Sequence, residues 1–354
     1  MNAFEKREIL LNKDILRYLF SEFIYTKEFV YFLQAHRCFH VEPYQYNFSN
    51  NKINLKDLKK RETKLKFVPL YYFDHFNVAT EKSFVFEKMK IKHLKTTPKC
   101  NKKLEECIFD IENSKIETIE FGKKFNKPLP QNLPSTLESI IFNQESNYNQ
   151  QLPENLPSSL KFIKFGYFYN EILPDNLPRS MISISFGHDY NQVLPENLPK
   201  TIQFIKFGNQ YNKPLSNNLP QSLVHLKFGT WYNSTLSENL PSNLKIIEFG
   251  DFYNKTLPKK LPDCLETIVF GDMYNQSLRE TLPQSLSSIE FGYLYNQPLP
   301  QNLPHHLNEI VFNTSVYSKT KNLGTNYHVK DDFLYKNEKK TNVQVFFRKK
   351  NVWF

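Results

Sequence analysis

The sequence has little cysteine and no long apolar run. Its four cysteines, Cys38, Cys100, Cys107 and Cys264, are scattered without a CxxC pair. Zinc sites and disulfide frameworks need regularly spaced cysteines, so neither is indicated. No apolar run approaches the roughly 18 residues of a membrane-spanning helix, and no signal peptide is recognisable. We therefore expect a cytoplasmic or otherwise intracellular protein without membrane association.

The motifs of common enzymes are also missing. The sequence contains no HExxH, GxSxG, GxxxxGK[ST] or GxGxxG pattern, and its acidic residues form no converging pair. His305 and His306 are adjacent, so they point to different sides of a strand or turn and make a poor metal pair. We expect no catalysis, no cofactor and no metal ion.

Positive charge is unevenly distributed. The net charge is +10, but residues 121–313 hold 15 lysines and arginines against 16 aspartates and glutamates. The excess therefore lies towards both ends of the chain. A solenoid that followed nucleic-acid phosphates would carry basic residues along its face, so we expect no nucleic-acid partner.

One pattern, Y-N-x-x-L-P-x-N-L-P-x-x-L-x-x-I-x-F-G-x-x, recurs between residues 116 and 313. The step is 21 residues except between Phe142 and Phe165, where it is 23. Eight of the nine glycines directly follow a repeat Phe, where we expect glycine, as at Gly187, to permit a backbone bend. The repeat phenylalanines are Phe121, Phe142, Phe165, Phe186, Phe207, Phe228, Phe249, Phe270, Phe291 and Phe312. A fixed period of this kind is typical of a solenoid.

Each repeat predicts a short strand and a non-helical return. Ile184, Ser185 and Phe186 alternate inward and outward, and the same column in every repeat makes a parallel ladder. Pro174 and Pro178 oppose helix on the return path. The apolar positions of one repeat need neighbouring repeats to bury them. The predicted fold is a repeat solenoid with a parallel β-sheet and a proline-rich, non-helical back.

An asparagine follows the aromatic residue that opens each repeat. We expect it to bond to the backbone of adjacent turns instead of to a ligand, because a residue needed in every turn serves the fold. The column comprises Asn126, Asn149, Asn170, Asn191, Asn212, Asn233, Asn254, Asn275 and Asn296.

The runs Tyr295-Asn296-Gln297-Pro298-Leu299-Pro300 and Phe125-Asn126-Lys127-Pro128-Leu129-Pro130 resemble the FNIP repeat. That family is related to leucine-rich repeats and is abundant in social amoebae and amoebal giant viruses. The resemblance implies a leucine-rich-repeat-like solenoid, residues 116–313, used for protein interaction and not for catalysis.

Residues 1–45 form a different segment. Residues 4–40 contain no proline or glycine and have apolar residues at helical spacing, which predicts a small α-helical segment. The segment also resembles an F-box, which FNIP proteins of amoebal giant viruses often carry. The resemblance implies that Ile15, Leu16, Leu19 and Phe20 contact a Skp-type adaptor. The alternative is a helical cap on the first solenoid turn.

Two flanking segments complete the chain. Residues 46–115 are interpreted as degenerate early repeats, with a loop at 47–54, strands at 65–68 and 83–86, and a shifted repeat strand at 104–109. Residues 314–354 are interpreted as a C-terminal cap with strands at 333–335, 343–347 and 352–354. Such a cap would cover the open end of the ladder.

The outward strand positions are the candidate binding surface. Mixed aromatic and basic residues on a rigid sheet suit an acidic, partly apolar segment of a protein partner. The candidate residues are Phe162, Lys164, Phe204, Lys206, His225 and Lys227, together with Trp231, which stands just past Gly229 at the rim of the same region. The alternative is a merely solvated sheet face.

Two functions are compatible with these patterns. One is a substrate-recruiting adaptor of a Skp–cullin–F-box ubiquitin ligase, with the amino-terminal segment bound to the Skp-type adaptor. The other is a stand-alone interaction scaffold without a ubiquitin role. In either case we expect a monomer.

Overall fold

The computed structural model describes residues 48–54, 73–78, 92–96, 98–107, 111–112, 114–278, 282–314, 323–324 and 326–349. The chain divides into two compact units, Met1–Ser146 with Asn155–Leu160, and Asn147–Glu154 with Lys161–Phe354. The expected helical segment at 4–40, with Ile15, Leu16, Leu19 and Phe20, lies outside the described residues. No helix in the described part of the chain has the length and apolar character of a membrane span.

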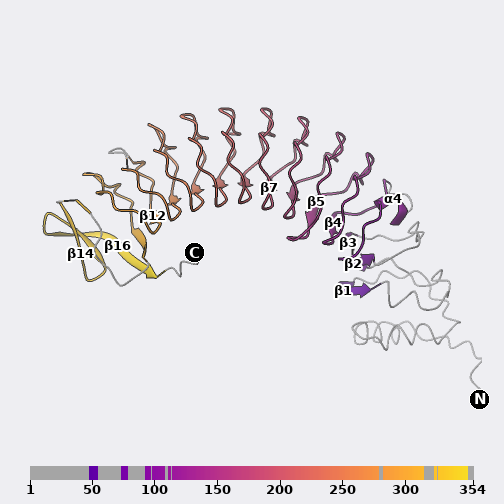
Figure 1. The fold of residues 1–354 in the computed structure, drawn as a ribbon, viewed down its shortest axis with the longest axis horizontal. Helices are drawn as coiled ribbons and strands as arrows, with labels where there is room; N and C mark the ends of the chain where they lie inside the picture. The colour runs from indigo at the N-terminus through magenta and orange to yellow at the C-terminus, as the bar shows by residue number, and fades with distance from the viewer. Residues whose placement is uncertain are drawn as a thin grey trace, which may run out of the picture. The chain divides into compact units, whose positions relative to one another are not determined.

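The first unit carries five parallel strands that pair in chain order (Figure 1). They are β1 (Phe48–Asn54), β2 (Phe73–Val78), β3 (His93–Thr96), β4 (Thr118–Phe121) and β5 (Ser139–Phe142). Equivalent apolar residues are aligned, because Leu94 pairs with Ile119 and Ile119 pairs with Ile140. All three side chains are buried.

Two expectations in the first unit were wrong. The segment expected to be a loop forms β1, because main-chain groups make a parallel ladder and polar side chains do not prevent it. The shifted repeat strand expected at 104–109 is not formed, since Leu104–Cys107 make one helical turn, α4. Leucine and glutamate favour helix, and β3 supplies the ladder strand at this level instead. The strands expected at 65–68 and 83–86 lie outside the described residues.

The second unit repeats one short strand in strict register. Its strands are β6 (Phe162–Lys164), β7 (Ser183–Ser185), β8 (Phe204–Lys206), β9 (His225–Lys227), β10 (Ile246–Glu248), β11 (Thr267–Val269), β12 (Ser288–Phe291) and β13 (Glu309–Thr314). Each pairs in parallel with the next, and equivalent repeat residues are partners. The predicted parallel β solenoid is confirmed. Within this unit the strands follow the inner edge of the ribbon and the Leu-Pro turns the outer edge (Figure 1).

The return path is non-helical, as predicted. Prolines such as Pro174 and Pro178 remove amide donors, and a hydrogen-bonded turn follows the second of them, with Met181 N–H donating to Pro178 O at 3.0 Å. The leucines before the prolines, such as Leu173 and Leu177, are buried. The back therefore closes each turn through its apolar side chains and tight turns.

Aromatic columns fill the core of the second unit. Repeat phenylalanines such as Phe186 and Phe207 stack on one another, with ring centroids 5.7 Å apart. Each also stacks on the tyrosine four residues later, as for Phe186 and Tyr190 at 3.7 Å. These rings are almost fully buried. Stacked neighbours therefore share one core, as the repeat pattern requires.

The glycine column has a different cause from the one expected. Gly187 does not have the positive φ that favours glycine, which among the described glycines occurs at Gly324. A Cβ on Gly187 would instead overlap the carbonyl oxygen of Gly166 in the preceding turn. Glycine is needed because successive backbones approach closely, not because the chain bends sharply there.

The asparagine column forms the expected backbone bonds. Asn191 N–H donates to Asn170 Oδ1 at 2.8 Å, and Asn212 N–H donates to Asn191 Oδ1 at 3.0 Å. The same bond links each later pair up to Asn275 and Asn296. The side chains thus satisfy main-chain donors of the following turn, which confirms their structural role.

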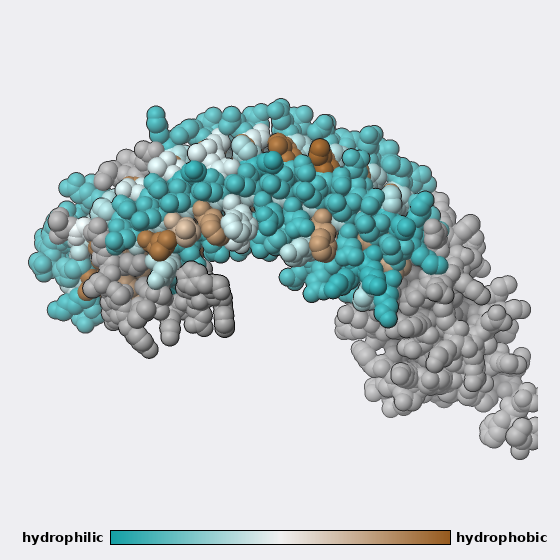
Figure 2. All heavy atoms as spheres, in the orientation of Figure 1, coloured by the Kyte–Doolittle hydropathy of each residue, from teal (hydrophilic) through white to brown (hydrophobic). Residues whose placement is uncertain are grey.

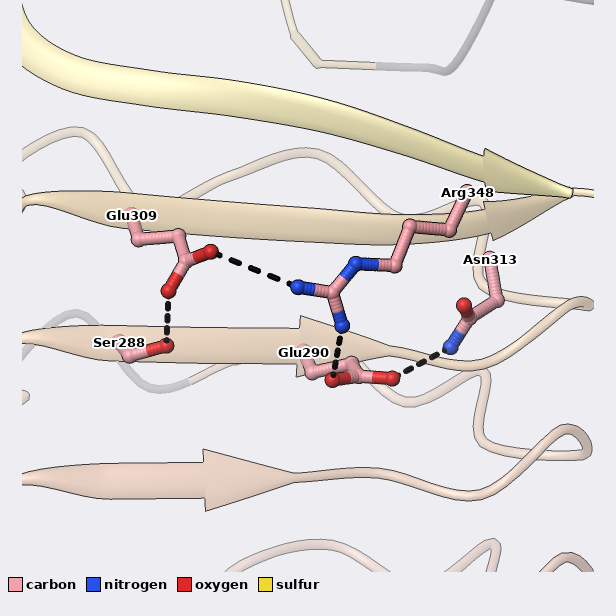
Figure 3. A network of polar contacts seen from close by, with 5 residues as sticks. All are labelled: Ser288, Glu290, Glu309, Asn313 and Arg348. Atoms are coloured by element: carbon pink, nitrogen blue, oxygen red, sulfur yellow. Dashed lines mark hydrogen bonds and ion pairs between the residues drawn. The ribbon is translucent and has the colours of Figure 1, made fainter.

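Three strands extend the sheet beyond β13. β16 (Lys339–Lys349) pairs in parallel with β13, β15 (Phe333–Lys336) is antiparallel to β16, and β14 (Tyr327–Lys330) is antiparallel to β15. The strands expected at 333–335 and 343–347 are confirmed, and that at 352–354 lies outside the described residues. Arg348 reaches Glu290 at 3.4 Å and Glu309 at 3.7 Å, which ties β16 to two repeat strands (Figure 3).

Candidate interaction face

The candidate face is the outward side of the short strands in the second unit. In β6, Ile163 is buried in the core while Phe162 and Lys164 on either side are exposed. The alternation follows from the pleat, which sends successive side chains to opposite faces. The same alternation recurs in β8 and β9, where Lys206 is exposed and Phe204, His225 and Lys227 are half-buried, so these strands also present the predicted residues outward.

Lys164 and Lys206 make the basic part of this face. Both are exposed, and no ion pair joins either to another residue in the part of the chain that the structure describes. Ser185 lies between them in the ladder, since Lys164 pairs with Ser185 and Ser185 with Lys206. The two ammonium groups are therefore presented from β6 and β8 on either side of a small polar residue.

Two aromatic side chains occupy the neighbouring slot. Phe162 is 42% exposed and Phe204 is half-buried, and both precede a buried isoleucine. The ring of His225 on β9 meets that of Phe204 edge to face, with centroids 4.9 Å apart and planes at 76°. The Phe204 ring is thus packed against a side chain of the next strand.

A glutamate changes the electrostatics at β9. Glu248 on β10 contacts His225 Nε2 through Oε1 at 2.7 Å and accepts a hydrogen bond from Lys227 through Oε2. The hydrogen bond with His225, with Lys227 beside it, lowers the pKa of Glu248 to about 2. Lys227 is therefore neutralised locally, and the basic part of the face is centred on Lys164 and Lys206.

Trp231 lies beyond the strand ends and belongs to a different row. It is 46% exposed and stacks on Phe252, with ring centroids 4.2 Å apart and planes at 11°. Met273 and Leu294 occupy the same position in the next two repeats and are also exposed. The structure thus places the predicted strand residues of β6, β8 and β9 on one face. It places Trp231 in a separate row, with residues that we did not predict.

A repeat-wise signal for these missed residues exists in the sequence. Trp231, Phe252, Met273 and Leu294 each stand two residues after a repeat glycine. Apart from Trp231, we considered only the columns before the repeat phenylalanine, because strand alternation determines which side chains of a strand point outward. Reading every column of the repeat for exposed apolar residues would have found this row.

The described residues contain no group of three or more His, Cys, Asp or Glu side chains placed to hold a metal ion. His305 and His306 are both exposed. His306 lines a surface depression with Glu266, Gln284, Ser285, Ser287 and Asn308. The chemistry that the strand face supports is recognition by aromatic contact and positive charge.

The family model of the FNIP Repeat matches residues 148–189, 190–230 and 253–294. No curated protein matches the chain. Among solved structures, the crystal structure of CroV588, described as a novel circular LRR protein structure, is similar with 27% identity and a TM-score of 0.60. YopM from Yersinia enterocolitica WA-314 shows 18% identity and a TM-score of 0.47.

The similarity extends over most of this chain but over less of the similar structures. It covers 78% of this chain, 42% of the CroV588 chain and 63% of the YopM chain. The matched repeats coincide with the strands, the asparagine ladder and the stacked aromatic columns described above. The chain therefore carries FNIP repeats, and these repeats build a leucine-rich-repeat-like parallel β solenoid.

Proposed function

We propose that the chain is a protein-interaction scaffold that binds a partner through the outward face of β6–β9. The observation that carries the proposal is the outward placement of Phe162 with Lys164 and of Phe204 with Lys206 on a rigid ladder. Exposed aromatic anchors beside positive charge favour an acidic, partly apolar segment. No residue on this face is arranged for catalysis, so the proposed role is binding alone.

The test is a charge reversal on this face. A partner is first captured by proximity labelling with the full chain. Lys164→Glu with Lys206→Glu should weaken that partner's affinity and flatten its salt dependence, because the attraction is partly electrostatic. Melting temperature should not change, since exposed charges contribute little to folding. Lys227 is left intact because its reversal would place a carboxylate against Glu248.

Lys200→Glu with Lys259→Glu is the matched control. Both lysines are exposed residues of the Leu-Pro turns, and the double change alters net charge by the same amount. The control should bind as the unmodified chain does. An equal loss of affinity in the control and in the Lys164 and Lys206 variant would show a non-specific charge effect. Full affinity of the Lys164 and Lys206 variant would exclude this face as the binding surface.

A finer proposal is that the scaffold recruits substrates to a Skp–cullin–F-box ubiquitin ligase. Its support is the F-box-like pattern that includes Ile15, Leu16, Leu19 and Phe20. Ile15→Asp with Leu19→Asp in the full chain should abolish binding to a Skp-type adaptor and leave the melting temperature of the solenoid unchanged. Should the unmodified chain fail to bind the adaptor at micromolar concentration, the stand-alone scaffold is the correct function.

A further inference from the structure

An exposed apolar row crosses the carboxyl-terminal repeats of the second unit. Trp231, Phe252, Met273 and Leu294 are 46%, 37%, 40% and 42% exposed. Figure 2 shows apolar side chains gathered in a short line over the turns near β12. In the preceding repeats the same column holds Asp189 and Gln210, so the continuous apolar stretch begins at Trp231. Four exposed apolar side chains in consecutive turns are more than isolated surface residues.

Main-chain hydrogen bonds hold the row in place. Phe252 N–H donates to Thr230 O at 2.9 Å, Met273 N–H to Asp251 O at 2.8 Å, and Leu294 N–H to Asp272 O at 2.8 Å. Each of these three amides thus bonds to the previous turn, at the residue immediately before the row residue of that turn. The row is a preformed surface, which lowers the entropic cost of binding.

Carboxylates directly precede two residues of the row in the sequence. Asp251 and Asp272 directly precede Phe252 and Met273, and the adjacent strand positions carry further acids. The charged residues at the outward positions of β9–β13 are Lys227, Glu248, Glu290 and Glu309, and Arg348 of β16 reaches the last two. Lys227 pairs with Glu248, and Arg348 bridges Glu290 and Glu309. The negative excess favours a basic partner and opposes an anionic membrane surface.

The spacing of the row residues favours one secondary structure for the bound segment. Neighbouring parallel strands lie about 4.8 Å apart, so the four row residues repeat at about this interval. An α-helix along the row offers one apolar residue per turn at a pitch of about 5.4 Å. An extended segment offers residues on one face about 6.8 Å apart, so its side chains fall out of step with the row residues within two repeats. A helix therefore matches four successive repeats and a strand does not.

We propose that the row formed by Trp231, Phe252, Met273 and Leu294 binds an amphipathic α-helix with basic flanks, presented by a partner protein. This rests on the proposed scaffold function but uses a surface other than the Lys164 and Lys206 face. Apolar residues of the helix at i, i+4, i+7 and i+11 cover the row, and lysines or arginines beside them meet Asp251 and Asp272.

The test uses an 18-residue leucine–lysine peptide with leucines at helical spacing. The full chain with Trp353→Phe retains Trp231 as its single tryptophan, so its emission reports on the row directly. Peptide binding should shift this emission to shorter wavelength. Affinity should be about tenfold or more above that of a scrambled peptide, a leucine–glutamate peptide and a period-two leucine–lysine peptide.

Phe252→Ser with Met273→Ser keeps the reporter and should weaken binding by about tenfold or more. Ile172→Ser with Val193→Ser, which removes two exposed apolar residues outside the row, should leave affinity within about twofold. The proposal is overturned if the scrambled or period-two peptide binds as tightly, or if the row variant binds normally. Self-association lost in the row variant would also overturn it, because a second copy would then be the occupant.

The two proposals fail separately. If the peptide does not bind but a captured partner still depends on Lys164 and Lys206, the scaffold function stands and the helix-binding row is wrong. If the peptide binds the row and no partner depends on the lysine face, the row stands and the proposed binding face is wrong.

Discussion

The ring of Phe207 lies against the ring of Tyr211, with centroids 3.7 Å apart and planes at 14°. The same pairing recurs in the repeats on either side, and Phe207 also stacks on Phe186 and Phe228. A single side chain therefore contacts three turns. This connection makes the stability of one repeat depend on its neighbours.

Phe207→Ala should destabilise the fold by about 3–5 kcal/mol, because it opens a cavity beside rings that are fully buried. Several turns should unfold together, which chemical denaturation followed by circular dichroism would detect. Phe204→Ala is the control, since that side chain is outward and half-buried, and its cost should be much smaller. Similar losses for both variants would contradict the assignment of inward and outward columns.

Tyr211→Phe should leave stability unchanged or raise it by up to about 1–2 kcal/mol. The Tyr211 hydroxyl is buried without a hydrogen-bond partner in the described part of the chain, and burial raises its pKa, so it stays neutral. The chain itself has Phe125 at the equivalent position, stacked on Phe121 at 4.2 Å. A loss above about 1 kcal/mol in urea unfolding would show that the hydroxyl is bonded.

Gly208→Ala should destabilise the protein by about 1–3 kcal/mol or more, because the new Cβ would overlap the Gly187 carbonyl oxygen. Asn209→Ala, at the next and exposed position, should change stability by less than about 0.5 kcal/mol. Thermal unfolding of both variants gives the comparison. A neutral Gly208→Ala would mean that neighbouring turns can move apart without cost.

Glu248→Gln should remove stability only where the carboxylate is ionised. Its pKa falls from an ordinary value of 4.5 to about 2 in the folded chain, so its contribution is complete above pH 4.5 and is lost as pH falls toward 2. The free energy of unfolding should be lower than that of the unmodified chain by up to about 3 kcal/mol at pH 6 and by almost nothing at pH 2. Unfolding free energies across this range would measure it, and a constant difference would refute the ion-pair explanation.

The repeated part of the fold could be predicted because each turn restates the same constraints. The positions of Phe207, Asn212 and Pro220 follow from a fixed period, and an error at one repeat would conflict with the others. β1 and α4 were missed because they lie where that period has degraded and local preferences compete. The glycine column was predicted correctly in position but not in cause, since close approach between backbones is a tertiary property.

The candidate face was predicted in outline. Strand alternation placed Lys164 and Lys206 outward, because the side-chain direction follows from the pleat. The pairing of Lys227 with Glu248 was not predicted, since it joins side chains from different turns and depends on their rotamers. Phe252, Met273 and Leu294 were missed because they lie outside the strands, where alternation does not apply. Trp231 was predicted, but as part of the strand face and not as the start of this row.

Site-specific photo-crosslinking in cells with the full chain tests directly whether a partner binds the strand face. One crosslinker replaces Ser185, between Lys164 and Lys206 on the strand face, and another replaces Asn217, an exposed residue of the Leu-Pro turns. We expect a discrete crosslinked partner from position 185 and none from position 217. Capture from position 217 with none from position 185 would show that the strand face is not the binding surface.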